Sequence, residues 1–212
     1  PAGAVTTTAR GTQQNIQKYK YLRRKPARGE FLDRTHALNR GLVHFWPMWE
    51  GSGNSLEELS ASRSAGTFVN TPSWATLGYG SALSFDGLTS RISFTTPSLP
   101  LITISALVYV RTAGDSDFPR IVDMPGYQFY FGKDTTLPLT GDDDTLKFSS
   151  VRVVDGVWNS PQGSLPNGTP FWVAVTYDNS ATTNNPQLYI NGVPVTTSIQ
   201  VVPVGAVTDN AG

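Results

Sequence analysis

The strict alternation of side chains along residues 101–110 limits the folds open to this chain more than any other feature. In the segment LITISALVYV, one face of an extended strand would carry Ile102, Ile104, Ala106, Val108 and Val110, and the other Thr103, Ser105, Leu107 and Tyr109. Successive side chains of a β-strand point to opposite faces, so this pattern predicts a strand that packs one face on a core.

The segment FWVAVTYD, residues 171–178, repeats this pattern. Its two rows are Trp172, Ala174 and Thr176 on one face and Phe171, Val173, Val175 and Tyr177 on the other. Trp46 and Trp172 lie on segments that resemble central strands, and we expect both to be core residues because a large aromatic side chain gains most from burial.

Turn residues separate these and other short apolar segments. PQLYINGVPV combines two strands with Asn-Gly, the dipeptide that most favours a hairpin. Hairpins are also expected around Pro125–Gly126 and, between SALSFDG and RISFT, around Asp86–Ser90. GLVHFWPMW is predicted to be a strand, with Pro47 marking an edge or a bulge. About eleven such strands predict an all-β fold, specifically an antiparallel β-sandwich.

The composition supports this fold class. Charged residues make up only 15% of the chain, and it contains 20 glycines and 15 prolines, which is typical of a β-rich protein with many turns. The chain has no cysteine, so disulfide bonds play no part. Because no apolar run approaches the roughly 18 residues needed to cross a bilayer, we expect no membrane partner.

Charge is distributed unevenly along the sequence. Residues 1–40 contain nine Lys and Arg against two acidic residues, a net charge of +7, and residues 41–212 contain seven against fourteen, a net charge of −7. We therefore divide the chain into a basic, extended N-terminal arm, residues 1–40, and a folded domain, residues 41–212. The segment FLDRTHALNRG predicts one helical turn, with Asp33 as its cap and Gly41 at its end.

A basic cluster in the arm is the predicted partner-binding site. It consists of Lys18, Lys20, Arg23, Arg24, Lys25 and Arg28. Three roles are open for it: contact with another protein, a solvated tail, or contact with nucleic acid phosphates. We favour a protein partner, because the remainder of the chain is acidic and would attract the arm of a neighbouring copy within an assembly.

Several motifs occur in a familiar order. They are GLVHFWPMWEGSGNSL, ELSASRSAGTF, WATLGYGSALSFDGLTSRISF, FWVAVTYD and LYINGVPV, over roughly residues 40–200. This order resembles the laminin-G-like branch of the concanavalin A-like lectin/glucanase jelly-roll family. The opening THALNRGLVHFWPMWEGSG is similar to laminin-G-like proteins encoded by tailed phages and environmental viral genomes. The resemblance implies an antiparallel jelly roll, a fold that serves many unrelated functions.

The sequence departs from the family pattern in three places. Glu58 stands where many relatives have an Asp that helps to hold calcium, and the loop that follows differs as well. Relatives usually have further strands after the Asn-Gly hairpin, so the domain is expected either to lack its last strands or to receive an edge from another chain. The enzymatic relatives have two acids two to four residues apart on one strand, which no predicted strand here has.

Candidate catalytic and metal-binding residues are few. A glycosidase needs two carboxyl groups about 5–9.5 Å apart, but Glu50 is isolated and the adjacent Glu57 and Glu58 would point to opposite faces of a strand. The GDDD segment, residues 141–144, offers oxygen ligands to calcium, although a solvated turn explains it more simply. His36 and His44 are the only histidines, so no zinc site is expected. We therefore expect a non-enzymatic protein without a cofactor.

Aromatic side chains near loops are the candidates for carbohydrate contact. Trp74, Tyr127 and Trp158 could stack on a sugar ring, or they could be buried at an edge of the sandwich with their polar groups bonded to backbone.

Together these features predict a structural or decoration protein of a virion. Its arm would anchor it to other capsid proteins, and its jelly roll would face outward or bridge subunits, with self-association into a homo-oligomer also open. The alternative is a carbohydrate-binding, lectin-like module of a secreted or cell-surface adhesin.

Overall fold

A computed structural model describes residues 32, 35–61, 64–77, 80–110, 119–132, 145–166 and 168–208. The chain divides between Thr95 and Thr96 into two compact units, and each is considered by itself. The predicted boundary of the arm at residue 40 stays a prediction, because residues 1–31 lie outside the described part of the chain.

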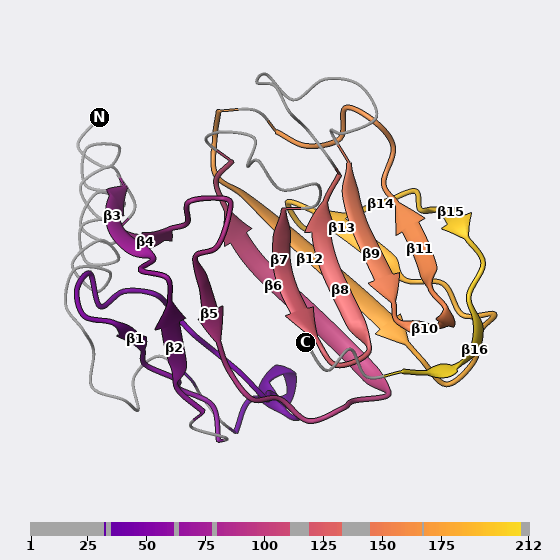
Figure 1. Cartoon of the computed structure of the whole chain (residues 1–212), viewed down its shortest axis with the longest axis horizontal. Coiled ribbons are helices and arrows are strands. Elements are labelled where there is room, and N and C mark those ends of the chain that lie inside the picture. Colours follow the sequence, from indigo (N-terminus) through magenta and orange to yellow (C-terminus); the bar gives the residue numbers. More distant parts are fainter. Residues whose placement is uncertain are drawn as a thin grey trace, which may run out of the picture. The chain divides into compact units, whose positions relative to one another are not determined.

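The described residues of the first unit form one short 3-10 helix and five short strands. They are η1 (Ala37–Asn39), β1 (Ser55–Leu56), β2 (Gly66–Val69), β3 (Ser73–Leu77), β4 (Gly80–Ser84) and β5 (Arg91–Ser93). The strands form two antiparallel sheets, one in the order β1-β2-β5 and one of β3 and β4 (Figure 1). The helical turn predicted near Gly41 is therefore present as η1, where the Asn39 N–H donates to the His36 carbonyl at 2.9 Å. The predicted cap, Asp33, lies outside the described residues.

The predicted hairpin at Asp86–Ser90 is wrong. β4 pairs with β3, whereas β5 pairs with β2, so the loop passes from one sheet to the other. The Asp86 carboxylate closes this loop by accepting bonds from the backbone N–H groups of Leu88 (2.9 Å), Thr89 (3.0 Å) and Ser90 (2.9 Å). Its bonds to the Ser90 side chain and to these N–H groups hold the pKa of Asp86 well below its usual range.

The strand predicted over GLVHFWPMW is also absent, because residues 42–50 form no ladder. Pro47 has no N–H to donate, and Met48 follows it with φ +54°, which ends the extended conformation. Two isolated bonds hold Phe45 instead of a ladder. The Phe45 N–H donates to the Glu58 carboxylate at 2.9 Å, and the Phe45 carbonyl accepts from the Leu59 backbone N–H at 3.1 Å.

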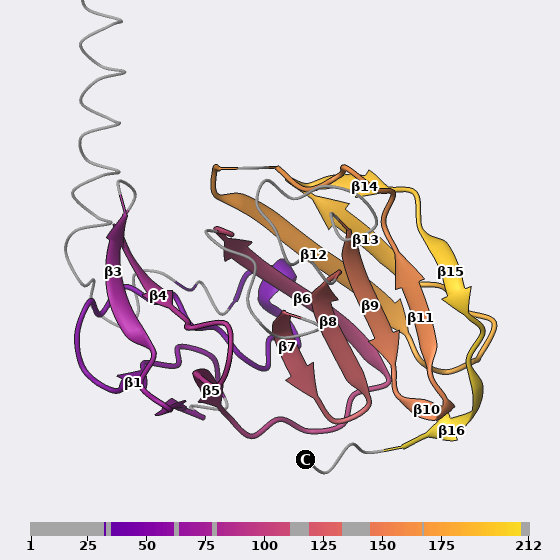
Figure 2. The same ribbon diagram turned by 45° about the horizontal axis from the view of Figure 1, so that its top comes forward.

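The second unit contains the longer strands. They are β6 (Leu101–Val108), β7 (Arg120–Met124), β8 (Tyr127–Phe131), β9 (Leu146–Ser150), β10 (Arg152–Val154), β11 (Gly156–Asn159), β12 (Phe171–Asp178), β13 (Gln187–Ile190), β14 (Val193–Val195), β15 (Ser198–Val201) and β16 (Val204–Val207). A five-stranded sheet has the order β15-β11-β9-β8-β7 and a four-stranded sheet the order β14-β13-β12-β6, while β10 pairs with β16. All pairs are antiparallel, and the two larger sheets form separate layers (Figure 2).

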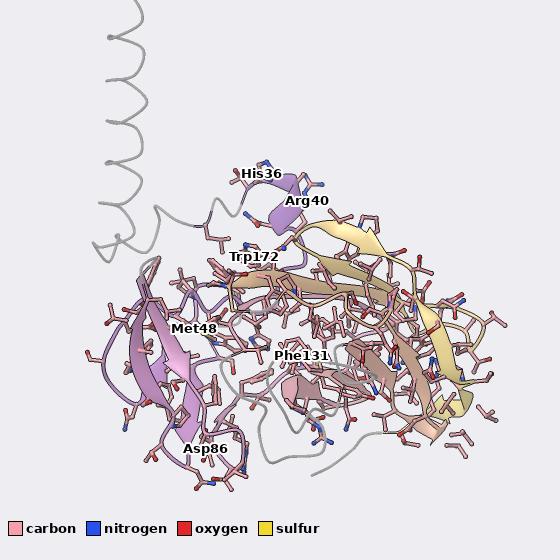
Figure 3. All side chains as sticks on the ribbon, turned by 90° about the horizontal axis from the view of Figure 1, so that it is seen from above. His36, Arg40, Met48, Asp86, Phe131 and Trp172 are labelled. Carbon is pink, nitrogen blue, oxygen red and sulfur yellow. The ribbon has the colours of Figure 1, made fainter. Side chains whose placement is uncertain are left out.

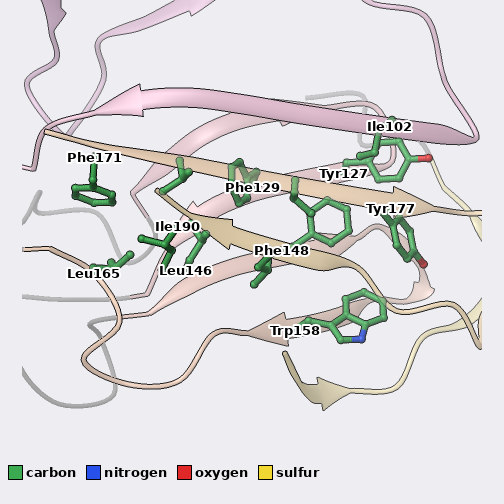
Figure 4. Packing of buried hydrophobic residues seen from close by; sticks show 13 residues of the cluster. Ile102, Tyr127, Phe129, Leu146, Phe148, Trp158, Leu165, Phe171, Tyr177 and Ile190 are labelled. Carbon is green, nitrogen blue, oxygen red and sulfur yellow. The ribbon is translucent and has the colours of Figure 1, made fainter. Parts of the chain in front are cut away.

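The core of the second unit lies between these two sheets. The four-stranded sheet contributes Phe171, Val173, Val175 and Tyr177 from β12, together with residues of β6 and β13. The five-stranded sheet contributes Tyr127, Phe129, Leu146, Phe148 and Trp158 (Figure 4). Aromatic rings contact one another across the two layers. The ring centroid of Tyr177 lies 5.1 Å from that of Phe148 and 5.5 Å from that of Trp158.

Two predicted hairpins of this unit are confirmed. β13 and β14 turn at Asn191 and Gly192, where φ is +51° and +77°, the left-handed conformation that a two-residue hairpin turn requires. β7 and β8 turn at Pro125 and Gly126. The all-β, antiparallel fold class is likewise confirmed among the described residues, and the jelly-roll topology stays a prediction.

Arg152 ties the two sheets of the second unit together. Its buried guanidinium donates to the Ser150 hydroxyl (3.2 Å), to the Gly205 carbonyl (2.9 Å) and to the Asn179 carbonyl (3.0 Å). Ser150 ends β9, Gly205 lies in β16, and Asn179 follows β12. One side chain therefore satisfies polar groups from three parts of the chain that lie far apart in sequence.

We expect Arg152→Ala to lower the free energy of unfolding by about 2–4 kcal/mol, because it removes a side chain that is 7% exposed together with its bonds to Ser150, Asn179 and Gly205. Lys147→Ala is the matched control, since Lys147 is only half-buried on β9, and it should cost about 0.5 kcal/mol or less. Urea denaturation followed by fluorescence measures both. Equal losses in the two variants would contradict the assigned role.

Candidate interaction surface

The candidate surface follows from the alternation of inward and outward side chains along β12. Phe171, Val173, Val175 and Tyr177 point into the core, so the intervening residues point away from it. Trp172 is one of these, and its side chain is 53% exposed. Figure 3 shows Trp172 and the core-packed Phe131 on opposite sides of the β12 ribbon. The prediction that Trp172 is a core residue is therefore wrong.

The neighbouring strand β6 continues the exposed row. Trp172 stands directly opposite Leu107, Ala174 opposite Ser105, and Asp178 opposite Leu101. Leu107 and Leu101 are both more than half exposed. The sequence predicted the two rows of β6 as they occur, with Ile102, Ile104, Ala106, Val108 and Val110 packed on the core.

These residues belong to one continuous side of the four-stranded sheet. We call it the apolar outer face and define it as Leu101, Thr103, Ser105, Leu107, Trp172, Ala174, Thr176, Gln187, Tyr189 and Pro194. None of these residues is charged, and Asp178 marks the end of the face.

The turn between β13 and β14 fixes the backbone of Trp172. The Trp172 N–H donates to the Asn191 side-chain oxygen at 3.0 Å, and the Asn191 N–H donates to the Trp172 carbonyl at 2.8 Å. Trp172 is thus held at both of its backbone polar groups, while its indole stays exposed. Because the backbone under this exposed ring is already fixed, the chain loses less conformational entropy when a partner covers Trp172.

The outer side of the five-stranded sheet is chemically different. Arg120, Asp123 and Lys147 lie on it, and Arg120 forms an ion pair with Asp123 at 2.7 Å. Charged and polar outward rows are the usual form of a sheet that faces water. The outer face of the four-stranded sheet has polar residues, Thr103, Ser105, Thr176 and Gln187, but no charged residue before Asp178 at its end. The lack of charge and the exposed Trp172 make that face the stronger candidate for contact with a partner.

Two of the three aromatic candidates for sugar contact are buried. Tyr127 and Trp158 are each 1% exposed within the core, and the Trp158 indole N–H donates to the Asn185 side-chain oxygen at 2.9 Å. The Tyr127 hydroxyl donates to the Leu99 carbonyl, and burial raises the pKa of this phenol. Neither ring leaves a face on which a sugar could stack, so the hypothesis of sugar contact is wrong for these two residues.

Trp74 is the remaining candidate. It lies on β3 in the first unit, half-buried beside Phe68 at 5.9 Å between ring centroids. Its indole N–H donates to the Gly53 carbonyl at 2.9 Å, which fixes the orientation of the ring. The partly exposed ring is compatible with sugar contact and with a structural role at the end of the GSG turn.

Glu50 and Glu58 of the first unit accept hydrogen bonds from backbone N–H groups. Glu58 is 4% exposed, and one of its oxygens accepts bonds from Phe45 N–H and from Ser60 N–H at 2.8 Å. Glu50 accepts from the Glu57 N–H at 2.5 Å, so it closes the turn as a capping residue does. Both carboxylates therefore bond to backbone N–H groups of the first unit.

His44 is packed in an aromatic cluster. Its ring stacks on Trp46 at 4.7 Å and 10° and meets Phe94 edge-on at 5.3 Å. Burial lowers the pKa of His44, and the nearby Glu58 carboxylate and a bond with Thr95 partly offset this effect. The imidazole is thus a half-buried packing element of the first unit.

The other predicted sites lie outside the described residues. They are the arm residues Lys18, Lys20, Arg23, Arg24, Lys25 and Arg28 and the GDDD segment at 141–144. Within the described ranges, no group of three His, Asp or Glu side chains is arranged to hold a metal ion. No helix of that part of the chain is long and apolar enough to cross a membrane.

Comparison of the chain with protein-family models, with curated proteins and with solved structures found no match. The resemblance to laminin-G-like jelly rolls therefore stays a prediction from motif order.

Truncation of Trp158 and of Trp172 should lower the free energy of unfolding by very different amounts. We expect Trp158→Ala to lower the free energy of unfolding by about 3–5 kcal/mol, because it empties a buried site. Trp172→Ala should cost less than about 1 kcal/mol, the size of one cross-strand pair. Thermal and urea denaturation of the two variants measure the difference. A loss at Trp172 as large as that at Trp158 would show that Trp172 is not a surface residue.

Proposed function

We propose that this chain is a non-enzymatic structural protein of a virion, a decoration protein that contacts other capsid proteins. In this proposal the basic arm anchors the chain. The jelly-roll domain bridges subunits through the apolar outer face.

The observation that carries the proposal is the exposure of Trp172 on a sheet face without charges. The centres of protein interfaces are enriched in aromatic residues and depleted of charged ones. Tryptophan is among the residues that most often dominate binding energy when a partner covers them. Trp172, Leu107 and Tyr189 lie on adjacent strands of this face and supply such a centre.

The charge distribution supports the role of the arm. Residues 1–40 carry a net charge of +7 and residues 41–212 a net charge of −7. An arm that is attracted to the acidic domain of a neighbouring copy or capsid subunit would bind faster and in a defined place. Contact with a protein surface is therefore favoured over contact with nucleic acid or a solvated tail.

The bonding of the carboxylates supports a role without catalysis. Glu50 and Glu58 both accept backbone N–H bonds, which organise residues 43–60. The motif order that resembles phage laminin-G-like proteins points to a virion. A virion is therefore the proposed location, with the extracellular space or a cell surface as the alternative.

The test is incorporation into particles purified from the virus that encodes the chain. We expect Trp172→Glu to reduce the copy number per particle at least about tenfold, because a charge would be buried in the contact. Deletion of residues 1–30 should also abolish incorporation if the arm is the anchor. Quantitative mass spectrometry of purified particles measures the copy number.

Thr67→Glu is the matched control, because it adds the same charge at an exposed position of β2. It should leave incorporation unchanged, and circular dichroism should show that all variants are folded. Absence of the chain from particles, or wild-type incorporation of Trp172→Glu, would refute the proposal.

A lectin-like module is the alternative, and the observation in its favour is the partly exposed Trp74 with its fixed ring. Under this alternative, the isolated chain would bind saccharides on a glycan array and Trp74→Ala would weaken that binding. No binding with or without calcium would count against it.

A further inference from the structure

The turn between β13 and β14 contains two residues that can react with each other. Asn191 and Gly192 are both exposed. The backbone nitrogen that follows an asparagine can attack the side-chain amide of that asparagine and close a five-membered cyclic imide. Glycine favours this attack more than other residues do, because it has no side chain to shield its nitrogen. Within the described ranges, Asn191 is the one asparagine that a glycine follows.

The bonds of the turn leave the reacting atoms available. The Asn191 side-chain oxygen accepts from the Trp172 N–H at 3.0 Å, so a donor lies beside the oxygen on which negative charge develops during the attack. A second bond, from the Asn191 N–H to the Trp172 carbonyl at 2.8 Å, holds the residue in place. No described group bonds to the Gly192 N–H, which is the nucleophile, or to the Asn191 side-chain nitrogen, which is the leaving group.

The backbone of the turn is close to the conformation that the ring needs. The φ values of +51° at Asn191 and +77° at Gly192 are those of a type I′ turn. Ring closure requires a ψ of about −120° at the asparagine, which is the value at the first central residue of a type II′ turn. The two turn types differ mainly in the orientation of the peptide unit between their central residues, and both fit a two-residue hairpin. Rotation of this exposed peptide unit would thus let the ring close while β13 and β14 stay paired.

We propose that Asn191 is a site of spontaneous deamidation, with water as the co-reactant. The Gly192 nitrogen loses its proton to solvent and forms a bond to Cγ of Asn191. The bond between Cγ and Nδ2 breaks, and Nδ2 takes up a proton and leaves as ammonia. Water then adds to either carbonyl of the imide and opens the ring, which yields an aspartate or an isoaspartate at position 191. The sum of these steps consumes one water and releases one ammonia.

Deamidation would change the surroundings of Trp172. Either product adds a negative charge beside the backbone of Trp172, at a face that has no charged residue before Asp178. An aspartate can still accept the bond from the Trp172 N–H. An isoaspartate lengthens the main chain of the turn by a methylene group, so it no longer fits a two-residue hairpin. The modification itself does not depend on the virion role.

Peptide mapping by mass spectrometry tests the proposal on the full chain, incubated at mildly alkaline pH both in buffer and in urea. Asn54 is the internal control, because it is exposed like Asn191 but is followed by a serine. In the folded chain we expect Asn191 to deamidate at least about tenfold faster than Asn54, because the glycine and the Trp172 N–H both favour its reaction. Its rate should lie within about tenfold of the rate in urea, because only an exposed turn has to move.

Fragmentation that separates isoaspartate from aspartate identifies the products, and the variant Asn191→Asp supplies the aspartate product as a standard. We expect both products at position 191, since water can open the imide at either carbonyl. An Asn191 that stays intact in the folded chain while it deamidates in urea would overturn the proposal. A rate at Asn191 no greater than that at Asn54 would overturn it as well.

Discussion

The alternation of side chains along β12 is the constraint on which the second unit depends. β12 is bonded on both sides, to β6 along its whole length and to β13, so its register is fixed from two directions. Phe171, Val173, Val175 and Tyr177 must then face the core together. A slip of one residue would exchange the two rows and bury Thr176 in place of Val175.

The same constraint produces the candidate surface. Trp172 cannot enter the core while Phe171 and Val173 occupy it, because neighbouring residues of a strand point to opposite faces. The Asn191 turn then fixes the Trp172 backbone, and Leu107 completes the row across β6. The exposed aromatic face and the buried core are therefore two consequences of one sequence pattern.

The second unit presents two outer faces that differ physically. The outer face of β6, β12, β13 and β14 has no charged residue before Asp178 and exposes Trp172, so a partner would bind it by burying side chains. The outer face of the five-stranded sheet carries the ion pair of Arg120 and Asp123, as a face in contact with water does.

Local signals predicted the parts of the fold that depend on local physics. The hairpins at Asn191–Gly192 and Pro125–Gly126 and the rows of β6 were all readable, because turn residues and alternation act over a few residues. The partners of β4 and β5 were not readable, because pairing across a loop depends on the whole unit and on how Asp86 folds that loop.

The candidate site was only half predictable. The sequence separates Trp172 from Phe171 and Val173 correctly, and this alternation favours exposure of Trp172, whereas the size of its indole favours burial. Tyr127 and Trp158 lie close to turns in the sequence, yet Tyr127 begins β8 and Trp158 lies within β11, and both side chains are buried in the core. Distance from a loop along the chain is a poor guide to depth in a sandwich of short strands.

Trp172 is exposed in the free chain, and we propose that a partner covers it in an assembly. Hydroxyl-radical footprinting with mass spectrometry tests it directly on the free chain and on purified particles, with Trp158 as the internal reference. We expect Trp172 to be oxidised much faster than Trp158 in the free chain and to be strongly protected in particles. Equal oxidation of Trp172 in the two states would contradict it, as would a Trp172 that is already protected in the free chain.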